Sequence, residues 1–335
     1  MTPIWKDTEL SASNTGRAVY TRIRKGGADG EIIFHGRVAD PGGAVLMNGV
    51  CADHLRVPLP LLDEVEEFTV HNPVAFTLEI SATGAAWLTK GTVEFYPNWS
   101  YDWEFTERAR PLTMAPSGEA VPGQYLFVTM MAEPGTAPAA TSLTLNGTRK
   151  DGTAYTREVA VPAGALIGTG VFTLPEFASP GDVLEVAGLT FRVAENCTRY
   201  VLYWVNDYGG WEQMPVRNGA PQADSVSRYT VQTGRLNTYG GNGSARAERE
   251  YANVTERTVR LGTGWLDDRG SALMRGLFNS TDILLFDTQA TSEAGRFVPL
   301  VLTDDTVEYK TFKGNGGQMV RYDFEARVAL NFVRR

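Results

Sequence analysis

Period-two alternation of apolar and polar residues is the feature that most constrains the fold of this chain. Segment 18–24 alternates in this way, and segment 75–80 follows the same pattern. Successive side chains of a β-strand point to opposite faces, so this period is typical of half-buried strands. Clusters of Gly, Pro and Asp at 25–30 and 40–43 predict tight turns between the strands. The sequence therefore predicts an all-β protein built of several β-sandwich modules.

Shifts in composition divide the chain into domains. Residues 1–110 carry strands with little helix, and residues 111–122 are rich in proline and small polar residues, which is typical of a linker. Residues 123–199 contain short strands at regular spacing, which favours a β-sandwich. Residues 200–335 are predicted to form a C-terminal β domain. Within it, residues 267–278 place apolar side chains at helical spacing behind two aspartates, so we predict the one short helix there.

The charge and hydropathy patterns argue against several classes of partner. A net charge of −8 disfavours a broad phosphate-binding surface, so we expect no nucleic-acid partner. A small basic group, Arg17, Arg22, Arg24 and Lys25, is expected to be a solvated strand edge. No run of 18 apolar residues is present, and the N-terminus lacks the pattern of a secretory signal. We therefore expect no membrane insertion.

The two cysteines, Cys51 and Cys197, are far apart in the sequence. A chain of 335 residues buries enough surface to be stable without a disulfide framework. A single bridge between the two cysteines stays possible, although we expect two buried thiols.

No catalytic or ligand-binding motif stands out in the sequence. His35, His54 and His71 have no metal-ligand spacing with one another or with a cysteine, and no nucleophile or phosphate-binding motif occurs between a strand and a helix. A glycoside hydrolase needs only two carboxylates. However, Asp267–Asp268 fits a helix start, and Asp304–Asp305 fits a turn between strands. We therefore predict no enzyme activity, no cofactor and no metal site.

The densest aromatic stretch is residues 200–216, YVLYWVNDYGGWEQMPV. Its Asn-Asp-Tyr-Gly-Gly segment predicts a turn between two strands, in which Gly209 and Gly210 are free to adopt positive φ. Trp and Tyr beside Asn and Asp are typical of a sugar-binding surface. They are also typical of a sandwich core or a subunit interface, which we favour here. The candidate interface or glycan-contact residues are Trp204, Asp207, Tyr208 and Trp211.

Three sets of motifs carry a family resemblance. The first is Ile4–Thr8 with Ile32–Val38, the second is Val93–Tyr101, and the third is Tyr203–Trp211 with Trp265–Phe278 and Val307–Phe312. Their order and spacing resemble an uncharacterised family in phages and prophages of gut bacteria, over nearly the whole chain. The genes of that family lie among tail genes. The C-terminal third is also similar to tail-tube and distal-tail proteins in general.

The resemblance implies a structural component of the phage tail tip or baseplate, made in the bacterial cytoplasm and located in the virion. It implies no catalytic residues. The likeness to tail-tube and distal-tail proteins implies a homo-oligomeric ring joined by sheets across subunits, with other tail proteins as partners. Two alternatives remain open: a carbohydrate-binding or adhesion module that contacts a host-surface glycan, and a glycan hydrolase.

Overall fold

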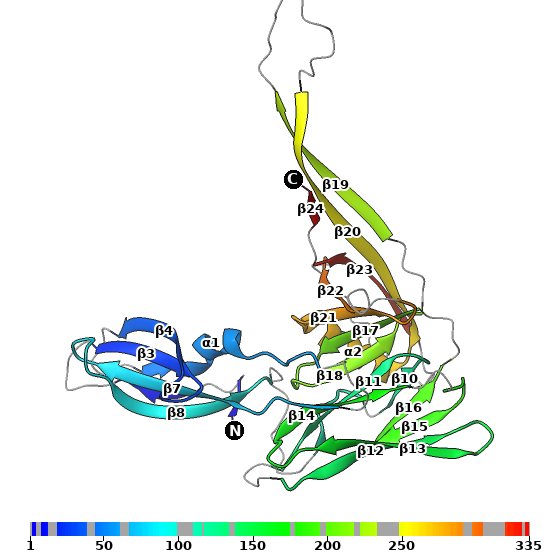
Figure 1. The fold of residues 1–335 in the computed structure, drawn as a ribbon, viewed down its shortest axis with the longest axis horizontal. Helices are drawn as coiled ribbons and strands as arrows, with labels where there is room; N and C mark the ends of the chain where they lie inside the picture. Colours follow the sequence, from blue (N-terminus) through cyan, green and yellow to red (C-terminus); the bar gives the residue numbers. More distant parts are fainter. Residues whose placement is uncertain are drawn as a thin grey trace, which may run out of the picture. The chain divides into compact units, whose positions relative to one another are not determined.

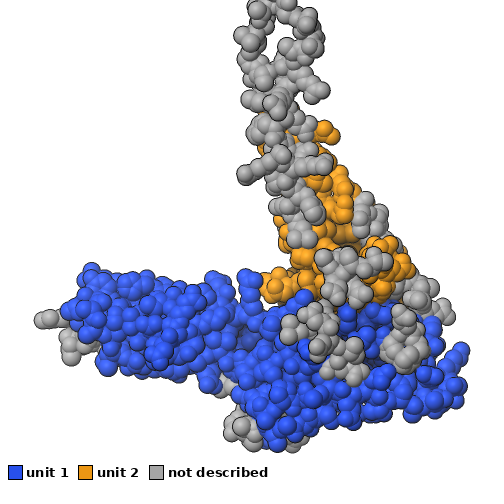
Figure 2. Space-filling model, in the orientation of Figure 1, with its two compact units in different colours: residues 1–195, 205–213 blue, residues 196–204, 214–335 orange. Residues whose placement is uncertain are grey.

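The computed structural model describes most of the chain, in fifteen segments. These are residues 2–4, 8–12, 19–38, 44–60, 67–98, 110–115, 117–133, 138–174, 178–194, 199–217, 222–232, 248–290, 297–303, 319–329 and 332–334. Strands predominate, and the described residues form two α-helices and one 3-10 helix, which confirms the predicted all-β class. The chain divides into two compact units, Met1–Glu195 with Val205–Gln213 and Asn196–Trp204 with Met214–Arg335 (Figure 2).

The first unit begins with a five-stranded sheet of order β1-β8-β7-β3-β4 (Figure 1). Strand β1 pairs with β8 in parallel, and the other neighbours are antiparallel. One face carries the buried side chains of Ile23, Phe76 and Leu78, which pack in one cluster with Met47 and Cys51. The strands are β1 (Thr2–Pro3), β3 (Val19–Lys25), β4 (Glu31–Val38), β7 (Val74–Ser81) and β8 (Leu88–Tyr96).

A short helical segment packs against this buried face. Strand β5 (Ala44–Leu46), which pairs with β2 (Glu9–Ser11), leads directly into α1 (Met47–Cys51) and the 3-10 helix η1 (Ala52–His54). Met47 and Cys51 are four residues apart, so a helix presents both to the same side, and both are fully buried.

Two further sheets of the first unit form a sandwich, with orders β10-β16-β15-β12-β13 and β6-β14-β11-β9. Leu126 and Phe172 of one sheet share a buried apolar cluster with Leu145 and Leu184 of the other, so the two sheets pack face to face. The strands are β6 (Phe68–Val70), β9 (Arg110–Pro111), β10 (Ser117–Ala120), β11 (Tyr125–Met131), β12 (Thr141–Thr148), β13 (Ala154–Val161), β14 (Ile167–Thr173), β15 (Val183–Val186) and β16 (Leu189–Val193).

The sandwich also contains strands from outside the segment 123–199. Strand β6 pairs with β14, and β9 pairs with β11. Strand β10 lies within the stretch 111–122, which its composition predicts to be a linker, and it pairs in parallel with β16. Proline and small residues are compatible with short strands at a sheet edge, where β9 and β10 both lie.

The second unit is built on a sheet of eight strands of order β18-β17-β21-β22-β23-β20-β19, with β24 also paired to β20, although residue 205 of β17 and residues 211–213 of β18 are assigned to the first unit. Its one α-helix among the described residues, α2 (Asp268–Asn279), covers one face, where Phe278 contacts Tyr322 and Phe324 at centroid distances of 6.4 and 5.4 Å. The strands are β17 (Tyr200–Val205), β18 (Trp211–Pro215), β19 (Gln222–Gln232), β20 (Glu248–Leu266), β21 (Ile283–Asp287), β22 (Phe297–Leu302), β23 (Val320–Val328) and β24 (Phe332–Arg334).

The helix predicted at 267–278 is confirmed. Asp267 is its N-cap, with extended backbone, and its carboxylate accepts a hydrogen bond of 2.8 Å from the Gly270 N–H. Leu273, Met274 and Leu277 fall on one buried face, as the helical spacing predicts.

Candidate functional site

The aromatic stretch forms the hairpin of β17 and β18. The chain passes from the second unit to the first at Val205 and returns after Gln213, so Trp204 and Trp211 belong to different units. Both indoles are buried, with 0% and 4% of the residue exposed. Trp211 meets Phe127 edge to face at 5.9 Å, and its Nε1 donates to the Pro58 carbonyl at 3.1 Å.

The other two candidate residues occupy the turn of this hairpin. Asp207 and Tyr208 are both partly exposed. Tyr208 packs against the buried cluster that contains Tyr96 and Leu112. The four candidates therefore share no exposed face, and the two buried indoles have no free ring surface on which a sugar could stack.

Asn206 organises the turn. Its Oδ1 accepts hydrogen bonds from the backbone N–H groups of Tyr208 and Gly210, both at 2.9 Å. Its Nδ2 donates to the Leu112 carbonyl at 3.0 Å and to Glu212 Oε1 at 2.9 Å. The amide thus makes four hydrogen bonds, which fixes the turn against the segment that contains Leu112.

Glu212 is a carboxylate buried next to this turn. Its Oε1 accepts from Thr113 Oγ1 at 2.7 Å and from the Met114 N–H at 2.6 Å, in addition to Asn206. Burial raises the pKa of Glu212, and these hydrogen bonds offset the rise only in part. The neighbouring Gln213 bonds the backbone N–H and carbonyl of Phe127 at 2.8 and 3.3 Å.

The sequence predicted Asn206 as part of the turn, but it did not identify Glu212 or Gln213 as structural residues. The available signal was two consecutive polar residues inside WEQMP, all five of which are buried in β18. A polar side chain in a buried strand needs hydrogen-bond partners, so such a pair indicates a polar network.

The two glycines of the turn have different roles. Gly209 has φ +79°, as predicted. Gly210 does not adopt positive φ, and this part of the prediction is wrong. A Cβ on Gly210 would lie 1.9 Å from the Leu112 carbonyl oxygen, so the residue is glycine because two backbone segments approach closely there.

The long ribbon of β19 and β20 is a second candidate site. Strand β19 is the last strand of its sheet, and all its side chains from Ala223 to Thr230 are exposed, including Val226 and Tyr229. In the part of the chain that the structure describes, residues 248–252 of β20 pair with β19 alone (Figure 1). A two-stranded ribbon is only marginally stable by itself.

The cysteines and the other carboxylate pairs add no further candidate site among the described residues. Cys51 is a free, buried thiol, as predicted, and burial raises its pKa to about 12. Cys197 and the Asp304–Asp305 pair lie outside the described residues. Within the described ranges, no three His, Cys, Asp or Glu side chains gather as a metal site would require.

Neither the family models nor the curated proteins contain a match to this chain. Among the described helices, none is both long and apolar enough to cross a membrane.

Proposed function

We propose that this protein is a non-enzymatic structural component of a phage tail tip or baseplate that assembles as a homo-oligomer through β-sheet contacts between subunits. The observation that carries the proposal is the exposed edge strand β19. The motif resemblance supplies the tail context, and with it the location in the virion and the other tail proteins as partners.

The edge of β19 is suited to pairing with another strand. An edge strand presents a row of backbone N–H and C=O groups, and proteins usually protect such an edge with a short strand, proline or inward-pointing charge. Strand β19 runs for 11 residues without proline. Of its two charged residues, Asp224 and Arg228, the first is paired with Arg257 on the neighbouring strand, at 2.8 and 3.1 Å, so this carboxylate does not oppose an incoming strand as a lone charge.

Exposed apolar side chains on β19 favour the same role. Val226 is 44% exposed and Tyr229 is 48% exposed. Extension of the sheet by another strand provides backbone hydrogen bonds, and burial of these two side chains adds a hydrophobic contribution to the same contact.

The assembly is tested by analytical ultracentrifugation of the full chain over a range of concentrations. We expect a discrete oligomer for the natural sequence and a monomer for Val226→Lys, because the substitution replaces exposed apolar area on β19 with a charge that the subunit contact would have to bury. Val301→Lys is the matched control, since Val301 is 46% exposed but lies on β22, which has a neighbour on both sides. A natural sequence that stays monomeric at its highest soluble concentration contradicts the proposal.

The tail location is tested separately. Antibodies against the purified chain should label one end of the tail in electron micrographs of phage particles from bacteria that encode it. Particles that do not react with the antibody in micrographs and in immunoblots rule out a virion component.

A further inference from the structure

The outward face of the five-stranded sheet in the first unit carries a group of arginine and aromatic side chains that the proposed assembly does not use. Arg22 and Arg24 were predicted to lie on a solvated strand edge, and this is wrong. Strand β3 pairs with β4 on one side and with β7 on the other, so it is an interior strand. Its arginines therefore extend over a sheet face.

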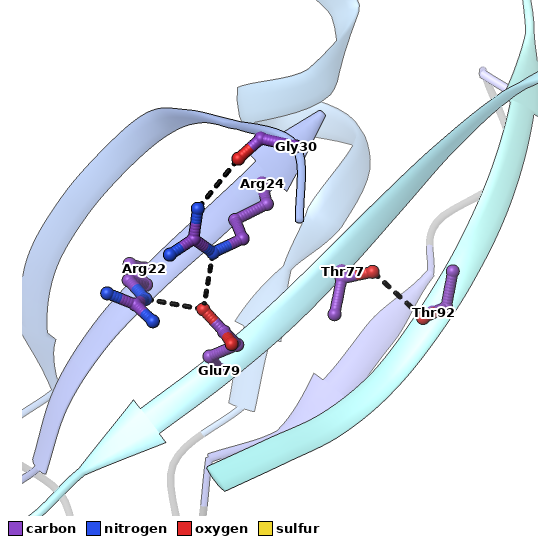
Figure 3. A network of polar contacts seen from close by, with 6 residues as sticks. All are labelled: Arg22, Arg24, Gly30, Thr77, Glu79 and Thr92. Carbon is purple, nitrogen blue, oxygen red and sulfur yellow. Dashed lines mark hydrogen bonds and ion pairs between the residues drawn. The ribbon is translucent and has the colours of Figure 1, made fainter. Parts of the chain in front are cut away.

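The two arginines share one carboxylate on this face. Figure 3 shows Arg22 and Arg24 pointing at the same oxygen of Glu79; Arg22 Nε bonds it closely, and Arg24 Nε bonds it at 2.8 Å. Burial alone would raise the pKa of Glu79, but the hydrogen bonds and charges of the two arginines outweigh burial and lower it. Glu79 is thus ionised and paired with both arginines.

A third guanidinium adds to the positive charge. Arg37 is directly opposite Tyr20 on β4 and is exposed. Its Cζ lies 5.6 Å from the Tyr20 ring centroid, and no described carboxylate pairs with it. Two guanidinium groups therefore share the Glu79 carboxylate, and a third lies on the same face. This surplus of positive charge attracts an anion although the whole chain is negative.

Aromatic rings line the same face. Trp87 lies under the Arg22 guanidinium, whose Cζ is 4.1 Å from the ring centroid. His35 meets Trp87 at 5.7 Å and stacks with Tyr20 at 6.5 Å, with only 9° between the two planes. Tyr20 and Trp87 are partly exposed and His35 is exposed, in contrast to the buried Trp204 and Trp211.

We propose that the face formed by Tyr20, Arg22, His35, Arg37 and Trp87 binds a glycan whose sugars carry a carboxylate, such as a uronic or sialic acid. The carboxylate would be held by Arg37 and by the outer N–H groups of Arg22, since a guanidinium matches a carboxylate with two parallel hydrogen bonds. The apolar face of the sugar ring would stack on Trp87 or Tyr20.

A nucleic acid fits this surface less well. Nucleic-acid binding requires several cations along a continuous strand of phosphates. Here Arg37 has no carboxylate partner among the described residues, and Arg22 and Arg24 share Glu79, on a chain of net charge −8. A single sugar carboxylate needs only one or two guanidinium groups, and this face supplies that number.

Titration calorimetry of the full chain tests the proposal with four probes. These are a tetrasaccharide of galacturonic acid together with sialyllactose as acidic sugars, the same tetrasaccharide with its carboxyl groups reduced to alcohols, and a dodecamer of thymidylate. We expect at least one acidic sugar to bind, on the order of tenfold more tightly than the reduced tetrasaccharide and the oligonucleotide, because charge-assisted bidentate bonds are lost with the carboxylate.

Variants locate the site. Arg37→Ala and Trp87→Ala should each weaken binding of the acidic sugar on the order of tenfold. Arg260→Ala and Trp265→Ala are the matched controls, because both residues are strongly exposed on the second unit, and both should leave binding unchanged. Circular dichroism and thermal unfolding verify that each variant is folded.

Three results with the natural sequence overturn the proposal. They are no binding of either acidic sugar, equal binding of the reduced tetrasaccharide, and tighter binding of the oligonucleotide. Binding that Arg37→Ala and Trp87→Ala leave intact also overturns it. The proposal does not depend on oligomerisation through β19, since the Val226→Lys variant should bind the acidic sugar as the natural sequence does.

Discussion

Glu212 shows how a single buried carboxylate links the turn at Asn206 to the segment at Thr113 and Met114. Its pKa is raised because burial disfavours the charged form. A carboxyl group with a raised pKa binds its proton more tightly in the folded state. The stabilisation that comes from this tighter proton binding is therefore fully present below the unfolded pKa of about 4.3. It is lost as the pH rises through the folded pKa of Glu212.

Two substitutions of Glu212 separate its charge from its hydrogen bonds. Glu212→Gln keeps Oε1 as the acceptor and removes the charge, so its stability relative to the natural sequence should increase from pH 4 to pH 8. Glu212→Ala leaves three donors without their acceptor and should cost about 3 kcal/mol. Urea unfolding at several pH values measures both effects, and parallel pH curves for the natural sequence and Glu212→Gln would contradict the argument.

The same residues show what the sequence can and cannot predict at this scale. The turn at Asn206–Gly210 follows from local preferences, and the positive φ of Gly209 was predictable. The reason for Gly210 was not, because the atom that excludes a side chain belongs to Leu112, about a hundred residues earlier in the chain. Likewise, the sequence pattern of an aromatic residue beside Asn and Asp is the same for a residue that stacks on a sugar as for one that packs on Phe127.

At the scale of elements, helix α2 was predicted almost to the residue because its signals are local. Asp267 provides the cap, and Leu273, Met274 and Leu277 provide the buried face. Asp267→Ala should destabilise the second unit by about 1 kcal/mol, because the Gly270 N–H loses its acceptor. Asp267→Asn retains an acceptor and should be nearly neutral. Denaturant unfolding of both variants measures the difference, and equal losses would show that the cap bond contributes nothing.

Strand partners were less predictable than strands. The pattern at 18–24 indicates a strand, and β3 is there, but the pattern does not tell whether that strand is at an edge or between two others. Arg22 and Arg24 consequently appeared as edge charges. Only the pairing of β3 with β7 brings them to Glu79, which is 57 residues away from Arg22 in the sequence.

At the scale of the whole molecule, the two units offer two different kinds of surface. The first unit presents Arg37 and Trp87 on a sheet face, and the second presents the backbone of β19 at a sheet edge. The division of the chain into these units was not readable from composition, because the first unit includes Val205–Gln213, which lies inside the C-terminal segment. A component of a larger assembly needs contacts with its own copies as well as with the surroundings, and separate surfaces allow both at once.

Hydrogen exchange at low and high protein concentration tests this division of roles. If copies pair through β19, amides of β19 that point away from β20 gain acceptors on assembly, and exchange across residues 223–230 should slow at high concentration. Strand β12 of the first unit has partners on both sides already and should exchange equally at both concentrations. The Val226→Lys variant should show no concentration dependence anywhere. Slower exchange confined to the first unit would place the subunit contact there instead, and it would make the face around Arg37 an interface between copies and not a glycan site.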